Sequence, residues 1–253
     1  MAEDSDDGTA RRFSPEGYAA LLAALTARGY AAQSYHDARP AARHLILRHD
    51  LDMSIAAALP MAAAESAAGL RATYFVLLRT EMYNPFSAEA RRMLDDIRGF
   101  GHEIGLHLDA ALYADDAAAL DRAAAVECDS LERILDAPVR VISFHRPAPA
   151  LLGYPETLAG RAHAYQPRFF SEMGYCSDSR GAWHHGHPLD QPAIAAGRAL
   201  QVLTHPLWWT APAGRAPEAR LRDFLSARTE QLDRALAAQC DIHRPRRDPK
   251  RRS

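Results

Sequence analysis

Residues 44–52 read HLILRHDLD, a short apolar run that ends in two aspartates, Asp50 and Asp52. An apolar run of this length is typical of a buried strand. The two aspartates are two positions apart, so both side chains lie on the same side of the chain if the backbone stays extended. Paired carboxylates can divide metal binding from proton transfer, although a turn or a helix cap would also explain them.

Strands and helices alternate on both sides of this segment. A helix is predicted over residues 14–29, because Ser14 can cap it and Pro15 suits the first helical position. Further helices are predicted over 55–68, 87–98, 115–135 and 217–238, and further strands over 71–78, 102–106, 139–144, 174–177 and 199–204. We expect Pro60 to kink or interrupt its helix and Gly105 to weaken its strand. The alternation predicts an α/β fold with a parallel sheet closed, or nearly closed, into a barrel.

The composition is that of an ordinary folded protein. The chain has 253 residues, of which 48% are hydrophobic and 25% charged, and a formal charge of −2. This charge balance gives no general attraction to nucleic acid or to anionic membranes. We expect a single domain over residues 13–242, between a disordered N-terminus over 1–12 and a basic disordered tail over 243–253, where nucleic-acid binding is the alternative reading.

The cysteines and the first residues of the chain bear on the cellular compartment in which the protein is expected. The three cysteines lie far apart and show no CxxC spacing, so neither a disulfide framework nor a zinc ribbon is supported. The first residues, MAEDSDDGTARR, are acidic where a secretory signal needs a basic patch followed by an apolar run. We therefore expect a cytoplasmic protein in a reducing environment, without a membrane span.

Residues capable of chemistry follow the predicted strands. They are Asp50 and Asp52 after the first strand, His107 after the third, then His145 with Arg146, then Asp178, and finally His205. In a parallel barrel the C-terminal ends of the strands converge on one face, and that face carries the active site. We therefore expect these side chains to meet in one pocket, although residues up to 155 positions apart are involved.

Each of these residues also has a structural explanation. Arg146 could form a forked ion pair with a carboxylate of the site or a purely structural one. His205 could exchange a proton near neutral pH, or be a core histidine with satisfied hydrogen bonds. The tryptophans Trp183, Trp208 and Trp209 could stack on a sugar ring or simply fill the core.

The ordered series RHDLD, RATYFVL, GHEIGLH, SFHRP, YCSDS and LTHPLWW resembles the polysaccharide deacetylase (NodB-homology) superfamily over about residues 44–210, in particular the subgroup with an Arg-His-Asp-x-Asp first motif. The resemblance implies a distorted (β/α) barrel of mainly parallel strands. It also implies a divalent-metal hydrolase that removes acetyl groups from N-acetylated sugars.

The chain departs from the better-known members at two points. Those members have adjacent aspartates, whereas Leu51 separates Asp50 from Asp52 here, and they have a His-x-x-x-His metal pair, whereas Ala111 stands four residues after His107. By its position at a strand end, His145 is the nearest substitute, which gives Asp52, His107 and His145 as the metal ligands. One carboxylate and two imidazoles suit Zn²⁺, with Co²⁺, Ni²⁺ or Mn²⁺ as alternatives.

The resemblance also suggests roles for the other residues. Asp50 would take a proton from the attacking water, Arg146 would keep that carboxylate ionised, and His205 would donate a proton to the leaving amine. Trp208, Trp209, Asp178 and Trp183 would contact the substrate. In a cytoplasmic enzyme that substrate would be a small sugar precursor of a surface polysaccharide. The alternatives are an amidohydrolase acting on a non-sugar C–N bond and a degenerate barrel that binds carbohydrate without turnover.

Overall fold

The computed structural model describes residues 8–113 and 116–244, which divide into two compact units at the bond between Ala213 and Gly214. The second unit contains the helix α8 (Pro217–Gln239). Most of the two ends predicted to be disordered lies outside the described residues, and the single domain over 13–242 stays a prediction. None of the described helices combines the length and apolar character that a membrane span needs. The cytoplasmic location also stays a prediction.

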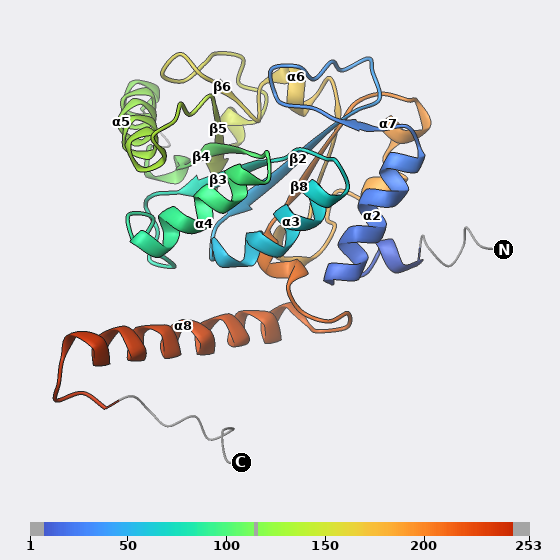
Figure 1. The fold of residues 1–253 in the computed structure, drawn as a ribbon. Helices are drawn as coiled ribbons and strands as arrows, with labels where there is room; N and C mark the ends of the chain where they lie inside the picture. Colours follow the sequence, from blue (N-terminus) through green and yellow to red (C-terminus); the bar gives the residue numbers. More distant parts are fainter. Residues whose placement is uncertain (1–7, 114–115, 245–253) are drawn as a thin grey trace. The chain divides into compact units, whose positions relative to one another are not determined.

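The first unit is built on a curled sheet of eight parallel strands within the described residues (Figure 1). They are β1 (Ala31–Ala32), β2 (His44–Leu51), β3 (Thr73–Leu77), β4 (Glu103–Asp109), β5 (Val141–His145), β6 (Ala162–His163), β7 (Gly174–Ser177) and β8 (Leu200–Thr204). The pairing order is β6-β5-β4-β3-β2-β8-β7, and β1 pairs with the start of β2. Each pairing is parallel, and no pairing joins β6 to β7 in the described residues. The sheet is thus a distorted, open (β/α) barrel, which confirms the predicted fold class.

Four longer helices of the first unit pack beside one another in chain order along the sheet (Figure 1). They are α2 (Pro15–Ala27), α3 (Leu59–Ala67), α4 (Ala88–Gly99) and α5 (Ala117–Leu135). Short helical turns connect other elements: η1 (Ala56–Ala58), η2 (Ala110–Tyr113), η3 (Pro149–Leu151), α6 (Pro167–Phe170), η4 (Ser179–Gly181), η5 (Pro188–Asp190), α7 (Pro192–Ala195) and η6 (Pro206–Trp209).

Local sequence explains where two of these helices begin. The Ser14 hydroxyl accepts a hydrogen bond from the backbone N–H of Gly17 at 3.0 Å, and Pro15 opens α2, as predicted. Pro60 does not kink a continuous helix. It lies in the first turn of α3, after the separate turn η1, where a proline costs no helical hydrogen bond.

Gly105 lies within β4 and does not end it. It pairs with Phe75 of β3, and a Cβ atom at position 105 would lie 2.5 Å from Cε1 of the Phe75 ring. The glycine therefore makes room for a buried aromatic side chain on the neighbouring strand. Gly105 has no side chain to pack, but the Phe75 ring fills the space beside it.

Candidate metal centre

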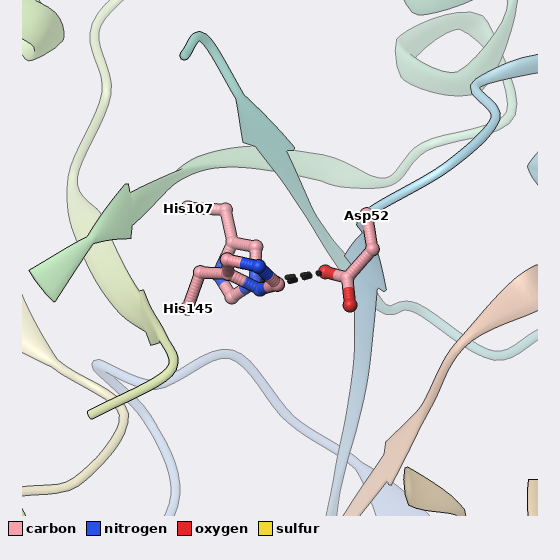
Figure 2. Close-up of side chains that lie close together, drawn as sticks. All are labelled: Asp52, His107 and His145. Atoms are coloured by element: carbon pink, nitrogen blue, oxygen red, sulfur yellow. Dashed lines mark ion pairs between the residues drawn. The ribbon is translucent and has the colours of Figure 1, made fainter. Parts of the chain in front are cut away.

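The C-terminal ends of β2, β4 and β5 bring together one carboxylate and two imidazoles (Figure 2). Oδ1 of Asp52 lies 3.0 Å from Nε2 of His107 and 3.4 Å from Nδ1 of His145. One candidate ligand atom from each residue lies within 4.8 Å of the other two. The three residues that the sequence assigned to a metal therefore form one cluster, while Ala111 lies in the turn η2.

The hydrogen bonding of this cluster fits a bound cation. Oδ1 of Asp52 is buried, and no described residue donates a hydrogen bond to it. Nδ1 of His107 lies 2.6 Å from the Ser143 hydroxyl, which in turn donates to Oδ1 of Asp50 at 3.4 Å. The Ser143 oxygen therefore accepts from Nδ1–H of His107, which leaves a lone pair on Nε2. Histidine ligands usually have this arrangement, so the residues present fit a divalent transition metal.

The electrostatics of the cluster keep its carboxylate ionised. Burial raises the pKa of Asp52, but the neighbouring His107 and His145 outweigh burial and hold that pKa well below its usual range. Burial lowers the pKa of His145, but the hydrogen bond and charge of Asp52, together with the charge of Asp109, outweigh burial, and the net change is upward. An ionised carboxylate is the form that binds a metal.

A buried ion pair holds the second aspartate. Arg48 donates from Nε to Oδ1 of Asp50 at 3.0 Å and from Nη2 to Oδ2 at 2.8 Å, and both side chains are almost fully buried. The Arg48 guanidinium also lies over the Tyr165 ring, 4.6 Å from its centroid. Burial raises the pKa of Asp50, but the charge and hydrogen bonds of Arg48, together with the charges of His107 and His205, outweigh burial, and the net shift is downward. Asp50 is therefore a carboxylate that can accept a proton.

The prediction that Arg146 holds Asp50 is wrong. Arg146 pairs instead with Asp109, a buried residue at the end of β4. Arg48 was missed in the sequence, although it precedes Asp50 by two positions and so shares its face of β2. The alternation of side chains between the two faces of a strand could have identified Arg48 as a neighbour of Asp50.

The end of β8 holds a histidine–aspartate pair. Nδ1 of His205 lies 2.6 Å from Oδ1 of Asp178, and Trp209 donates from Nε1 to Oδ2 of the same aspartate at 2.7 Å. Burial lowers the pKa of His205, but the hydrogen bond and charge of Asp178 outweigh it and raise that pKa to about 9. His205 therefore carries a proton at neutral pH, and its Nε2 lies 3.7 Å from Oδ2 of Asp52.

This pair corrects the predicted role of Asp178. The side chain of Asp178 is fully buried and its oxygens are bound by His205 and Trp209, so it does not face a substrate. It orients and charges His205 instead.

The three tryptophans occupy different environments. Trp208 lines the pocket described below, whereas Trp209 is 1% exposed and donates to Asp178. Trp183 packs against Phe13 and Trp209, with ring centroids 5.9 and 6.1 Å away. The prediction that Trp209 stacks on a sugar is wrong, because its ring is enclosed in the core. Trp208 lines the pocket but is itself only 4% exposed.

A pocket of about 320 Å³ opens over the cluster. Its polar lining includes Asp50, Asp52, His107, His145, Arg146 and His205. The pocket also has apolar walls, which include Phe144, Leu203 and Trp208. The predicted strand-end residues therefore line one pocket, except Asp178, which is buried and hydrogen-bonded to His205.

A second buried polar group lies on the opposite side of β2. His49 contacts the Thr204 hydroxyl through Nδ1 and Oε1 of Glu65 through Nε2, both at 2.6 Å. Tyr18 and Tyr74 also donate hydrogen bonds to Glu65. These contacts join β2 to β8 and to α3. His49 and Thr204 directly precede Asp50 and His205 in the chain. No role for His49 or Glu65 was predicted from the sequence.

Comparisons with known proteins give matches only among solved structures. No protein-family model matches the chain, and no curated protein matches it. A Streptococcus pyogenes deacetylase in complex with acetate matches with 15% identity and a TM-score of 0.44, over 82% of this chain and 85% of that one. A chitin deacetylase from the fungal pathogen Colletotrichum lindemuthianum matches with 16% identity and a TM-score of 0.44, over 79% and 86%.

A CE4 family pseudoenzyme from Bacillus anthracis also matches, with 16% identity and a TM-score of 0.36, over 77% of this chain and 64% of that one. The sequence motifs of residues 44–210 are the basis of the resemblance to the polysaccharide deacetylase (NodB-homology) superfamily.

Proposed function

We propose that the chain is a metal-dependent hydrolase of the polysaccharide deacetylase type, which removes an N-acetyl or similar N-acyl group from a sugar. One observation carries this proposal. The buried Oδ1 of Asp52, which accepts no hydrogen bond from the described residues, faces two imidazole nitrogens in a pocket that also holds a carboxylate and a protonated histidine. This combination supplies metal ligands, a proton acceptor and a proton donor at one place.

Asp52, His107 and His145 would hold the metal, with Zn²⁺ as the first choice and Co²⁺, Ni²⁺ or Mn²⁺ as alternatives. A divalent ion bound there would polarise the acyl carbonyl and acidify a water molecule. Ser143 would fix the ring of His107, because it binds the nitrogen that faces away from Asp52.

Asp50 and His205 would handle the two proton transfers of amide hydrolysis. Asp50 accepts the proton of the attacking water, since Arg48 keeps its carboxylate ionised and oriented. His205 donates a proton to the nitrogen of the departing amine, since Asp178 keeps its imidazole charged. The C–N bond breaks, and acetate and the free amino sugar are the products.

The pocket favours a small substrate. A volume of about 320 Å³ is at the lower end for small-molecule sites, which matches one sugar unit better than a long polymer. Trp208 lines the pocket, and the small part of it that is exposed would give a sugar ring an apolar contact. We therefore place the substrate among small glycan precursors.

The test is acetate release from a panel of N-acetylated amino sugars by metal-loaded protein. Asp50→Asn and His205→Ala should each lower kcat by roughly 10²- to 10⁴-fold, measured at a temperature at which each variant is still folded. Asp96→Asn, at an exposed position in α4, is the matched control and should keep full activity.

Three results would count against the proposal. Normal turnover in Asp50→Asn would remove Asp50 from the mechanism. Bound metal without release from any amide would indicate a carbohydrate-binding barrel. Release from non-sugar amides alone would indicate an amidohydrolase of another kind.

A further inference from the structure

Two arginines, Arg146 and Arg180, line the pocket without a part in the proton transfers. The Arg146 guanidinium is paired with Asp109. Arg180 lies in the turn η4, directly after β7 and Asp178, and its side chain is exposed. It has no hydrogen bond or ion pair with any other described residue.

Arg180 is the one full charge of the pocket lining that the described chain leaves unbalanced. The other charged groups of the lining have partners: Asp50 with Arg48, Asp52 with His107 and His145, Arg146 with Asp109, and His205 with Asp178. A guanidinium prefers a bidentate partner such as a carboxylate or a phosphate. The pocket therefore presents an unsatisfied anion-binding group to whatever enters it.

The backbone at Arg180 has a conformation that is unfavourable for an arginine. Its φ of 59° and ψ of 25° are left-handed, and the next residue, Gly181, has a φ of 74°. Glycine or asparagine is favoured at such positions. The described non-glycine residues with positive φ are Asp136, Arg146, Ala159 and Arg180, so two of the four are the arginines of this pocket. Strained residues of this kind gather at ligand sites.

The turn that carries Arg180 is anchored beside the proton donor. The N–H of Gly181 donates to the backbone oxygen of Asp178 at 2.9 Å, and the Asp178 side chain is fully buried against His205. The backbone of Arg180 is therefore held at a fixed place relative to His205. A long, charged side chain on a fixed backbone can reach a substituent of a substrate while the reacting amide lies at the metal ligands.

We propose that Arg180 recognises an anionic group on the sugar substrate, a phosphate or a carboxylate, and so determines which N-acylated sugars the pocket takes. This inference rests on the proposed function and names its substrate class. Charge-assisted hydrogen bonds of this kind correspond to roughly 10- to 100-fold in affinity.

The experiment measures sugar binding by calorimetry in the slow Asp50→Asn variant, so that turnover does not interfere. The probes are N-acetylglucosamine, N-acetylglucosamine 1-phosphate and N-acetylmuramic acid. We expect at least one anionic sugar to bind roughly 10- to 100-fold more tightly than the neutral sugar, and the two anionic probes separate phosphate from carboxylate.

Variants assign this preference to one side chain. Arg180→Gln should abolish the preference for the anionic sugar, and Arg180→Lys should restore part of it. Arg92→Gln, at an exposed arginine of α4, should keep the full preference. Arg180→Gly should also abolish the preference while its urea midpoint stays equal to or above that of the parent, because glycine accepts the left-handed backbone. This last readout separates ligand binding from a structural role.

Equal binding of the neutral and anionic sugars, or a preference that survives in Arg180→Gln, would overturn the inference. Failure of both anionic sugars to bind would overturn it as well. The proposed function is judged separately, by bound metal and acetate release. Acetate release together with equal binding of neutral and anionic sugars would refute only the role of Arg180. Tighter binding of an anionic sugar without acetate release would refute only the proposed hydrolysis.

Discussion

Replacing Arg48 with methionine should destabilise the protein by about 3–5 kcal/mol, because it leaves the Asp50 carboxylate buried without a counter-charge. The side chains of Arg48 and Asp50 are 0% and 3% exposed. Two hydrogen bonds, of 3.0 and 2.8 Å, join them. Methionine keeps much of the apolar contact with the Tyr165 ring, so most of the loss comes from the charge that remains.

The same reasoning predicts a strong coupling between the two residues. Asp50→Asn should also destabilise, since it leaves the Arg48 guanidinium buried without its partner. The double variant Arg48→Met/Asp50→Asn removes both charges and should lose less than the sum of the single losses. We expect a coupling energy of about 2 kcal/mol, within the range for residues in direct contact.

Urea unfolding of the parent, the two single variants and the double variant measures this coupling. Arg146→Met combined with Asp50→Asn is the matched control, because Arg146 is 59% exposed and pairs with Asp109. Its coupling with Asp50 should stay below about 0.5 kcal/mol. Additive losses for Arg48 and Asp50, or a large coupling between Arg146 and Asp50, would refute the ion-pair assignment.

Two further predictions concern pH. A general acid must be protonated, so kcat should fall as the pH rises through the pKa of His205, about 9. Asp178→Asn removes the partner that raises this pKa, so the alkaline limb should move toward the ordinary value and kcat at about pH 8 should drop roughly thirtyfold; an unmoved limb would exclude His205 as the acid. Burial raises the pKa of Glu65, but His49 and two tyrosines outweigh burial, and the net shift is below the ordinary 4.5. The ionised Glu65 therefore adds stability that is complete above about pH 4.5 and is lost as the pH falls through the lower folded-state pKa. Glu65→Gln should lose less of its urea midpoint than the parent between about pH 6 and about pH 3, and an equal loss would contradict this assignment.

The sequence predicted six of the eight described strands and the ligand cluster because these follow local rules, whereas the two-residue strands β1 and β6 were missed. Apolar runs such as 44–47 and 199–203 identify buried strands, and β7 has the predicted bounds, Gly174–Ser177. In a parallel sheet, the polar residue that follows each run is carried to the same end. His107 and His145 could therefore be placed near Asp52 without knowledge of any contact.

The partners of the charged groups could not be predicted in this way. Asp50 had two candidate arginines, Arg48 and Arg146, and the choice depends on strand register. Asp109 of β4 pairs in register with His145 of β5, which places it beside the next residue, Arg146. This register is a long-range property that single-sequence patterns do not contain.

Adjacent side chains pose a related problem in Trp208 and Trp209. Both side chains are buried, at 4% and 1% exposure, and their positions in the turn η6 decide that only Trp208 lines the pocket. Neither composition nor spacing distinguishes the two tryptophans. Asp178 was also assigned the wrong role. Its partners His205 and Trp209 follow the neighbouring strand β8, and this pairing cannot be read from local sequence.

Elemental analysis of the purified protein tests the central claim most directly, namely that Asp52, His107 and His145 hold one divalent ion. The parent protein should contain about one equivalent of metal per chain, as a three-ligand site with an open position predicts. His145→Ala should lose most of it, whereas the control His36→Ala, at an exposed histidine, should not. A metal-free parent after growth with zinc, or a folded His145→Ala variant that keeps its full metal content, would contradict the account.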